Sequence, residues 1–126
     1  MPLLHTVKSH RIFSQARYSG IFYSTKFFVL QALKFDNPKL DDRSVSYIGL
    51  TVSKKIGNAV KRNRVKRRLR VASKQILASN GVEMVAYIFI AKSAIVCAPW
   101  SDLIEQTIDA VSFVNRKIMR PAPTAS

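Results

Sequence analysis

The chain has 126 residues, of which 48% are hydrophobic and 22% charged, a composition typical of one globular domain rather than of a disordered basic tail. Lys and Arg number 21 against 7 Asp and Glu, so the net charge of +14 favours a nucleic acid or an anionic membrane surface as partner. The single cysteine, Cys97, excludes an intramolecular disulfide and a cysteine-based zinc site, and its apolar neighbours predict a buried thiol.

We expect no signal peptide at the start of the sequence. Its first residues lack the apolar run of a signal peptide, and no window approaches the ~20 apolar residues of a membrane span. We therefore expect a cytoplasmic protein with one domain over residues 1–126, an ordered core over about 7–119, and a frayed Pro-rich tail at 121–126.

The first third of the chain predicts one helix and one strand. Residues 9–18 favour a short helix, because Ser9 can cap it and apolar residues recur at helical spacing before Gly20 ends it. The apolar run at 26–34 predicts a strand. Residues 18–24 leave a further short strand or a turn open.

A polar loop at 37–43 leads to a strand at 46–53 in which apolar and other residues alternate. Ile48, Leu50 and Val52 share the face that we expect to be buried. We expect the other face to lie outside the core; its residues are Tyr47, Gly49, Thr51 and Ser53.

The next element is predicted to be a long basic helix that ends near Ser79. Asn58 is a good N-cap, and Asn80 and Gly81 close the helix. One narrow apolar stripe faces the core, and most of the remaining circumference is cationic. The stripe consists of Val65, Leu69, Ala72 and Ile76.

Residues 84–91 are apolar at nearly every position, which predicts a strand buried on both faces. Residues 99–116 predict a last helix with Ile104, Ile108 and Val111 as its buried stripe. The pattern favours an α+β fold in the order α, β, β, basic α, β, α, without an internal repeat or a linker.

Residues 54–70 hold nine of the 21 basic residues, and no Asp or Glu occurs from residue 43 to 82. A solvated helix face usually mixes charges, whereas Lys66, Arg70 and Lys74 place like charges four residues apart. A membrane-surface helix is a second alternative, but the apolar stripe has no Trp or Phe and is needed for the core. Guanidinium groups match phosphate oxygens in pairs, so RNA is the favoured partner.

Two further features bear on the kind of RNA-binding protein. Aromatic residues crowd the first quarter of the chain, where they favour either a core or a groove that stacks unpaired bases. Protein-based catalysis has little support, because a nuclease needs converging carboxylates. The acids at Asp36, Asp41 and Asp42 fall in a loop, and His5 and His10 fall near the start.

The sequence VSKKIGNAVKRNRVKRRLR at 52–70 closely resembles the signature of the bacterial ribonuclease P protein subunit, and the resemblance extends more weakly over residues 7–119. It implies a holoenzyme in which a catalytic RNA with Mg²⁺ removes the 5′ leader from precursor tRNA. The protein is then a non-catalytic subunit that binds the catalytic RNA and the leader, with no membrane and no stable protein partner.

The resemblance also implies two sets of binding residues, one for each RNA. The set for the catalytic RNA is Lys54, Lys55, Asn58, Lys61, Arg62, Asn63, Arg64, Lys66, Arg67 and Arg70. The set for the leader is Phe13, Arg17, Phe28, Gln31, Gly49, Thr51, Arg62, Arg70 and Lys92.

The implied fold is an αβ sandwich like the second domain of a ribosomal S5-type protein, in the order α-β-β-β-α-β-α, with a left-handed crossover through the basic helix. The chain departs from the family pattern at Arg17 and Gln31, where aromatics are usual, at Tyr47, where Arg is common, and at Val71, where an acid is common. Arg17 and Tyr18 are candidates to replace the missing aromatic contact.

A structural ribosomal-type protein or an RNA chaperone is the rival interpretation, because either would share the charge and the fold. Neither has a reason to distinguish precursor tRNA from mature tRNA. Preference for the leader therefore separates the two interpretations.

Overall fold

The computed structural model describes residues 3–7, 10–34 and 45–119, which form one five-stranded sheet and three α-helices. The elements in chain order are β1 (Leu3–Thr6), α1 (His10–Ser19), β2 (Ile21–Ser24), β3 (Phe28–Lys34), β4 (Val45–Thr51), the 3-10 turn η1 (Lys54–Ile56), α2 (Ala59–Asn80), β5 (Val85–Ala91), the 3-10 turn η2 (Ser93–Cys97) and α3 (Trp100–Met119).

The predicted helices and strands are confirmed to within a few residues at their ends. The open segment at 18–24 contains β2, and β1 was not predicted at all. The predicted loop at 37–43, the tail at 121–126 and the capping residue Ser9 lie outside the described residues.

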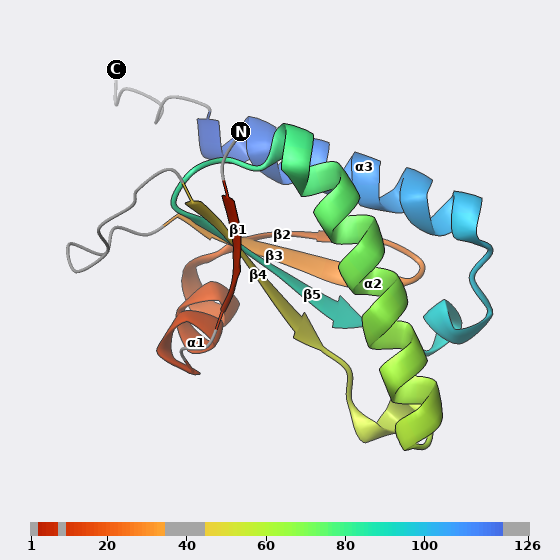
Figure 1. Ribbon diagram of the computed structural model, residues 1–126. Helices are drawn as coiled ribbons and strands as arrows, with labels where there is room; N and C mark the ends of the chain where they lie inside the picture. The colour runs from red at the N-terminus through yellow and green to blue at the C-terminus, as the bar shows by residue number, and fades with distance from the viewer. Residues whose placement is uncertain (1–2, 8–9, 35–44, 120–126) are drawn as a thin grey trace.

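The strands are arranged in the order β1-β4-β5-β3-β2, with β4 parallel to β1 and β5 and with β3 antiparallel to β5 and β2. Helix α2 connects the parallel neighbours β4 and β5. Figure 1 shows α1 on one side of the sheet and α2 and α3 on the other. The α+β class is confirmed, whereas the S5-type relationship and the left-handed crossover stay predictions.

The main core lies between the sheet and the α2–α3 layer. The predicted stripe of α2 is buried there, together with one face of β3 and β5. The first five residues of β5 are all buried, which confirms that this strand is covered on both faces. A smaller cluster under α1 joins Val7, Tyr47 and Ala86 to Ile12 and Phe13.

The predicted stripe of α3 is wrong at Ile108, which is exposed. Thr107 is fully buried instead, because its hydroxyl donates a hydrogen bond of 2.7 Å to the Leu103 carbonyl and so carries no unpaired polar group into the core. The prediction of a buried Cys97 is also wrong. The thiol is exposed, since Ile95 takes the inward position of η2.

A hydrogen-bonded network fixes the C-terminal end of α2. The Tyr87 hydroxyl donates to Asn115 Oδ1 at 2.5 Å and accepts from the Val82 amide at 2.9 Å. Asn115 Nδ2 donates to the Asn80 carbonyl at 2.7 Å, and Ser46 Oγ donates to the Val82 carbonyl at 2.8 Å. The network therefore joins α2, α3, β4 and β5 at one corner.

Burial raises the pKa of Tyr87 to about 12 from its usual value of 10.0, against the smaller lowering by its hydrogen bonds to Val82 and Asn115. Between these two pH values the unfolded chain loses the phenolic proton while the folded chain keeps it, so stability falls as pH rises. At ~1.4 kcal/mol per pKa unit, we expect a loss of roughly 2–3 kcal/mol between pH 10 and 12.

Chemical denaturation of the wild type and of Tyr87→Phe across this pH range measures the effect. The variant should be less stable at neutral pH, because it leaves Asn115 Oδ1 without its donor, and it should lose the part of the alkaline decline that Tyr87 causes. Tyr18→Phe on the exposed side of α1 is the control that keeps the decline. Equal alkaline declines in wild type and Tyr87→Phe would contradict the assignment.

Candidate nucleic-acid interface

The start of α2 is fixed by local geometry. The Asn58 side chain accepts a hydrogen bond of 3.0 Å from the Lys61 amide, which confirms the predicted N-cap. Gly57 has a φ of +146°, and a Cβ there would lie 2.8 Å from Lys61 Cδ. A glycine is therefore needed where η1 turns into the basic helix.

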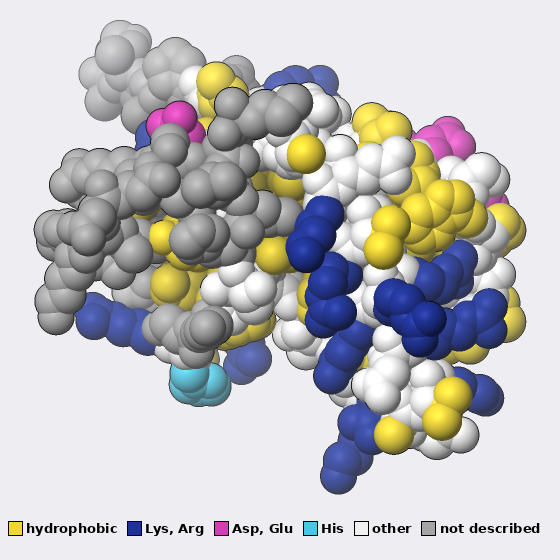
Figure 2. All heavy atoms as spheres, viewed as in Figure 1, with side chains coloured by type: hydrophobic (Ala, Val, Ile, Leu, Met, Phe, Trp, Pro, Cys, Tyr) yellow, Lys and Arg dark blue, Asp and Glu magenta, His cyan; other side chains and the backbone are white. Residues whose placement is uncertain are grey.

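The Lys and Arg side chains of η1 and α2 gather on one surface of the molecule. Figure 2 shows Lys and Arg side chains gathered over the N-terminal half of α2. Arg62 and Lys66 are half-buried at the side of the helix. The exposed members of the predicted set for the catalytic RNA are Lys54, Lys55, Asn58, Lys61, Asn63, Arg64, Arg67 and Arg70.

The guanidinium of Arg68, in the middle of α2, is bound within the protein. It donates to the Ile95 carbonyl at 3.3 Å and to the Ala98 carbonyl, and it lies 6.0 Å from the centre of the Trp100 ring. These contacts attach the middle of α2 to η2 and to the start of α3. The guanidinium is thus part of the scaffold.

On the α1 side of the sheet, the residues follow three rows that cross the strands, as the pairing registers show. The row under α1 contains Tyr47, Ala86 and Leu33. The next row contains Gly49, Ile88, Gln31 and Phe22, and the last contains Thr51, Ile90, Val29 and Ser24. We call the second and third rows the trough.

Phe13 of α1 reaches the first residue of the trough. A Cβ on Gly49 would lie 2.8 Å from Phe13 Cζ and 3.3 Å from Ile88 Cγ1, so only a glycine lets the ring lie over the strand. The structure thus brings Phe13 and Gly49, two members of the predicted leader set, next to each other.

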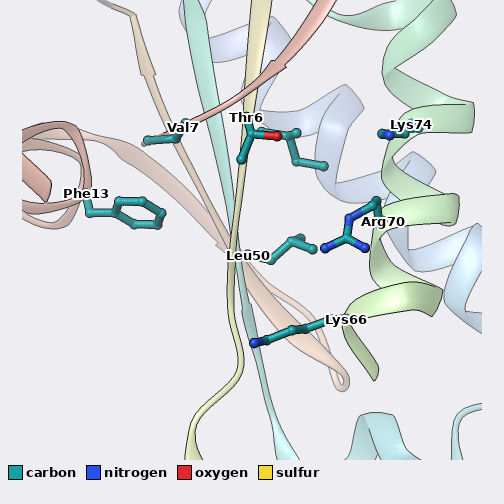
Figure 3. A pocket seen from close by; sticks show the side chains of 8 residues that line it. Thr6, Val7, Phe13, Leu50, Lys66, Arg70 and Lys74 are labelled. Atoms are coloured by element: carbon teal, nitrogen blue, oxygen red, sulfur yellow. The ribbon is translucent and has the colours of Figure 1, made fainter. Parts of the chain in front are cut away.

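A cavity of about 200 Å³ connects this aromatic side to the basic helix at the edge of β4. Phe13 and Val7 line one side, and Lys66, Arg70 and Lys74 line the other, as Figure 3 shows. Its further lining residues are Thr6, Ile48 and Leu50. The cavity thus brings together two members of the predicted leader set, Phe13 and Arg70, with two further cations, Lys66 and Lys74.

Some of the remaining members of the leader set lie in or beside the trough, whereas Arg62 lies outside the cavity. Gln31 and Thr51 belong to the trough, and Arg17 is exposed one helical turn after Phe13. Lys92 donates to Ser24 Oγ and to the Thr25 carbonyl, both at 2.6 Å, at the end of the last row. Arg62 does not line the cavity, although it precedes Lys66 by one turn of α2.

Two sequence-based predictions fail on this side of the sheet. Phe28 is fully buried on the opposite face with the main core, because neighbouring residues of a strand point to opposite faces. It therefore cannot meet a ligand in the trough. Tyr47, expected outside the core, is buried under α1 with Val7 and Ala86.

Phe22 was missed as a site residue. It lies opposite Gln31 on the paired strand, on the trough side, and 66% of its surface is exposed. The signal was present in the apolar alternation of residues 21–24, but the face of β2 could not be assigned without the register. Lys74 was recognised as cationic, but its place in the cavity depends on the position of β1.

Comparison with known proteins places the chain in a family. The family model described as Ribonuclease P matches residues 1–114. The chain belongs to the bacterial ribonuclease P protein family. This confirms the resemblance inferred from the motif at residues 52–70.

Two curated members of the family show how the similarity is distributed. The ribonuclease P protein component of Caulobacter vibrioides is 37% identical over 73 residues, which cover 58% of this chain and 49% of that protein. The matched stretch thus spans about half the length of that relative. The component of Carboxydothermus hydrogenoformans is 31% identical over 100 residues, covering 79% and 82%.

A solved structure supports the same fold for this ribonuclease P family member. The RNase P protein of Staphylococcus aureus has a TM-score of 0.65 and 23% identity, with 91% of this chain and 95% of that chain covered. None of the helices in the described ranges has the length and apolar character that crossing a membrane requires.

Proposed function

We propose that this chain is the RNA-binding subunit of a cytoplasmic ribonuclease P, in which an RNA subunit with Mg²⁺ removes the 5′ leader of precursor tRNA. In this proposal the exposed cations of η1 and α2 bind the catalytic RNA, and the trough holds the leader. The protein improves substrate affinity and broadens specificity without cleaving. Family membership and the uncompensated charge of residues 43–82 support it.

The observation that carries the leader assignment is the cavity at the edge of β4. A single-stranded leader presents phosphates and unpaired bases together, and proteins bind such strands with a cationic groove beside aromatic side chains. Lys66, Arg70 and Lys74 supply the cations, and Phe13 supplies the ring. A phosphate beside Arg70 therefore leaves the following bases near Phe13 and the trough.

The trough can take a strand with little sequence preference. Ile90 and Val29 are half-buried and offer apolar surface over the buried Ile88, while Gln31 and Thr51 offer polar groups at either side. Phe22 stands at the far end of the row that begins at Gly49, where an aromatic can stack on a further base. We assign it to the leader site in place of Phe28.

Mg²⁺ acts at the RNA subunit in this proposal. Within residues 3–7, 10–34 and 45–119, no three His, Cys, Asp or Glu side chains gather into a group that could hold a metal ion. The protein's contribution is to bind and orient the two RNAs, so that the scissile bond is presented to the catalytic RNA.

Reconstitution with the cognate catalytic RNA at low Mg²⁺ tests the proposal. We expect the protein to raise the cleavage rate of precursor tRNA and to bind leader-bearing substrate more tightly than mature tRNA. Cleavage assays and equilibrium binding of both tRNAs to the holoenzyme measure these effects. Equal affinity for the two tRNAs would leave the structural ribosomal-type or chaperone role as the better interpretation.

A further inference from the structure

Exposed apolar side chains lie where α2 and α3 face each other, one on α2 and the others on α3. Val71 is 50%, Trp100 42% and Ile108 45% exposed, and Ile104 is half-buried between the last two on α3. Figure 2 shows hydrophobic side chains gathered between α2 and the first part of α3, bordered by Lys and Arg side chains of α2. The cavity beside Phe13 lies on the other side of α2, so this is a separate surface.

Trp100 is held in place by α2. Arg68, which binds the Ile95 and Ala98 carbonyls, lies 6.0 Å from the centre of its ring, within the range of a cation–π contact. A side chain that is already ordered loses little conformational entropy when it binds a partner. The exposed part of the Trp100 ring is therefore a preorganised contact.

The charges around this surface favour an anionic partner. Arg64 is exposed one turn before Arg68, and Arg67 is exposed beside it. The nearest acids of α3, Asp102 and Glu105, follow Trp100 by two and five positions, which places them on the far side of that helix at ~100° per residue. The cations next to Trp100 thus have no acidic neighbour on α2 or on the near side of α3.

We propose that Trp100 stacks on an unpaired base of the catalytic RNA whose phosphates Arg64 and Arg67 contact. This inference rests on the proposed function and extends its RNA-binding surface from α2 onto α3. RNA supplies the phosphates and the π face together. A protein partner would have to bring acidic groups to meet the same cations, and the apolar strip offers it only a few side chains.

Fluorescence offers a direct test, because Trp100 is the single tryptophan of the chain. Titration of the full-length protein with its cognate catalytic RNA should quench the emission in step with binding. Trp100→Leu should bind that RNA about 5- to 150-fold more weakly, since stacking is worth ~1–3 kcal/mol per base. Trp100→Phe keeps a ring and should bind within a fewfold of the wild type.

The salt dependence separates stacking from charge. Trp100→Leu should keep the wild-type slope of log affinity against log salt, because no phosphate contact is removed. A lower slope would show that the substitution disturbs Arg64 and Arg67 and would overturn the stacking role. Thermal unfolding of both variants shows whether they fold. If Trp100→Leu does not fold, the quenching of the wild-type emission and the affinity of Trp100→Phe test the stacking role.

The two proposals fail in different ways. Normal binding of the RNA without quenching, with Trp100→Leu equal to the wild type, overturns the role of Trp100, leaves this surface to a protein partner, and leaves the proposed function standing. Failure of the wild-type protein to bind the catalytic RNA overturns both.

Discussion

Arg64→Ala combined with Arg67→Ala is expected to weaken binding to the catalytic RNA and to lower the salt slope by about 2, on the rule of about one unit per lost phosphate contact. Both side chains are exposed on α2, so their removal leaves the core unchanged. Between 50 and 200 mM salt, the fall in affinity should become about tenfold smaller than for the wild type. Filter binding or fluorescence titration over this range gives the slope.

The matched control is Arg116→Ala combined with Lys117→Ala, which removes the same charge from the exposed last turn of α3. If the effect depends on phosphate contacts at α2, the control should keep most of the wild-type slope. If the two double variants have the same salt slope, the net charge of the protein alone explains the slope, and the position of the cations on α2 does not matter. An unchanged slope in the α2 variant would mean that neither side chain meets phosphate.

Phe13→Leu should remove most of the preference of the holoenzyme for precursor tRNA over mature tRNA. Leucine keeps apolar contact beside Gly49 but cannot stack, and a stacked base is worth ~1–3 kcal/mol, so the preference should fall about 5- to 150-fold. Affinity for the catalytic RNA alone should stay near the wild-type value. Parallel titrations with both tRNAs and with the RNA subunit measure the three quantities.

Tyr18→Leu is the control on the same helix. Tyr18 is 84% exposed and lies about 140° around α1 from Phe13, so it points away from the trough. Its loss should leave the preference for the leader intact. The opposite result, with Tyr18 required and Phe13 dispensable, would move the stacking contact out of the cavity and would support the substitution suggested by the departure at position 17.

Much of the fold could be predicted, because the spacing of apolar residues along a helix or strand indicates which side chains are buried. The α2 stripe at Val65, Leu69, Ala72 and Ile76 and the continuous apolar run of β5 are buried as expected. The failures at Phe28, Tyr47 and Cys97 concern which side of an element faces which neighbour. The face that is buried depends on strand register and helix placement, which cannot be read from a single amino-acid sequence.

The candidate site could be predicted from the sequence where it coincides with a contiguous motif. Residues 54–70 identified the cations of α2, but the cavity needs β1, which pairs with β4 across about forty residues of sequence. Phe22 became a candidate for the proposed leader site only through its pairing with Gln31. The distinct role of Arg68 likewise depends on the Ile95 and Ala98 carbonyls, almost thirty residues away.

Helix α2 is attached at two places: Arg68 holds its middle to η2, and the network around Tyr87 and Asn115 holds its C-terminal end to α3. These contacts set the position of α2 relative to the sheet at its middle and at its C-terminal end. In the proposed holoenzyme, the distance between a catalytic RNA bound on α2 and a leader held in the trough is therefore set by the fold, and the protein acts as a spacer of fixed length. Loosening either attachment should broaden the choice of cleavage position before it lowers the affinity for RNA.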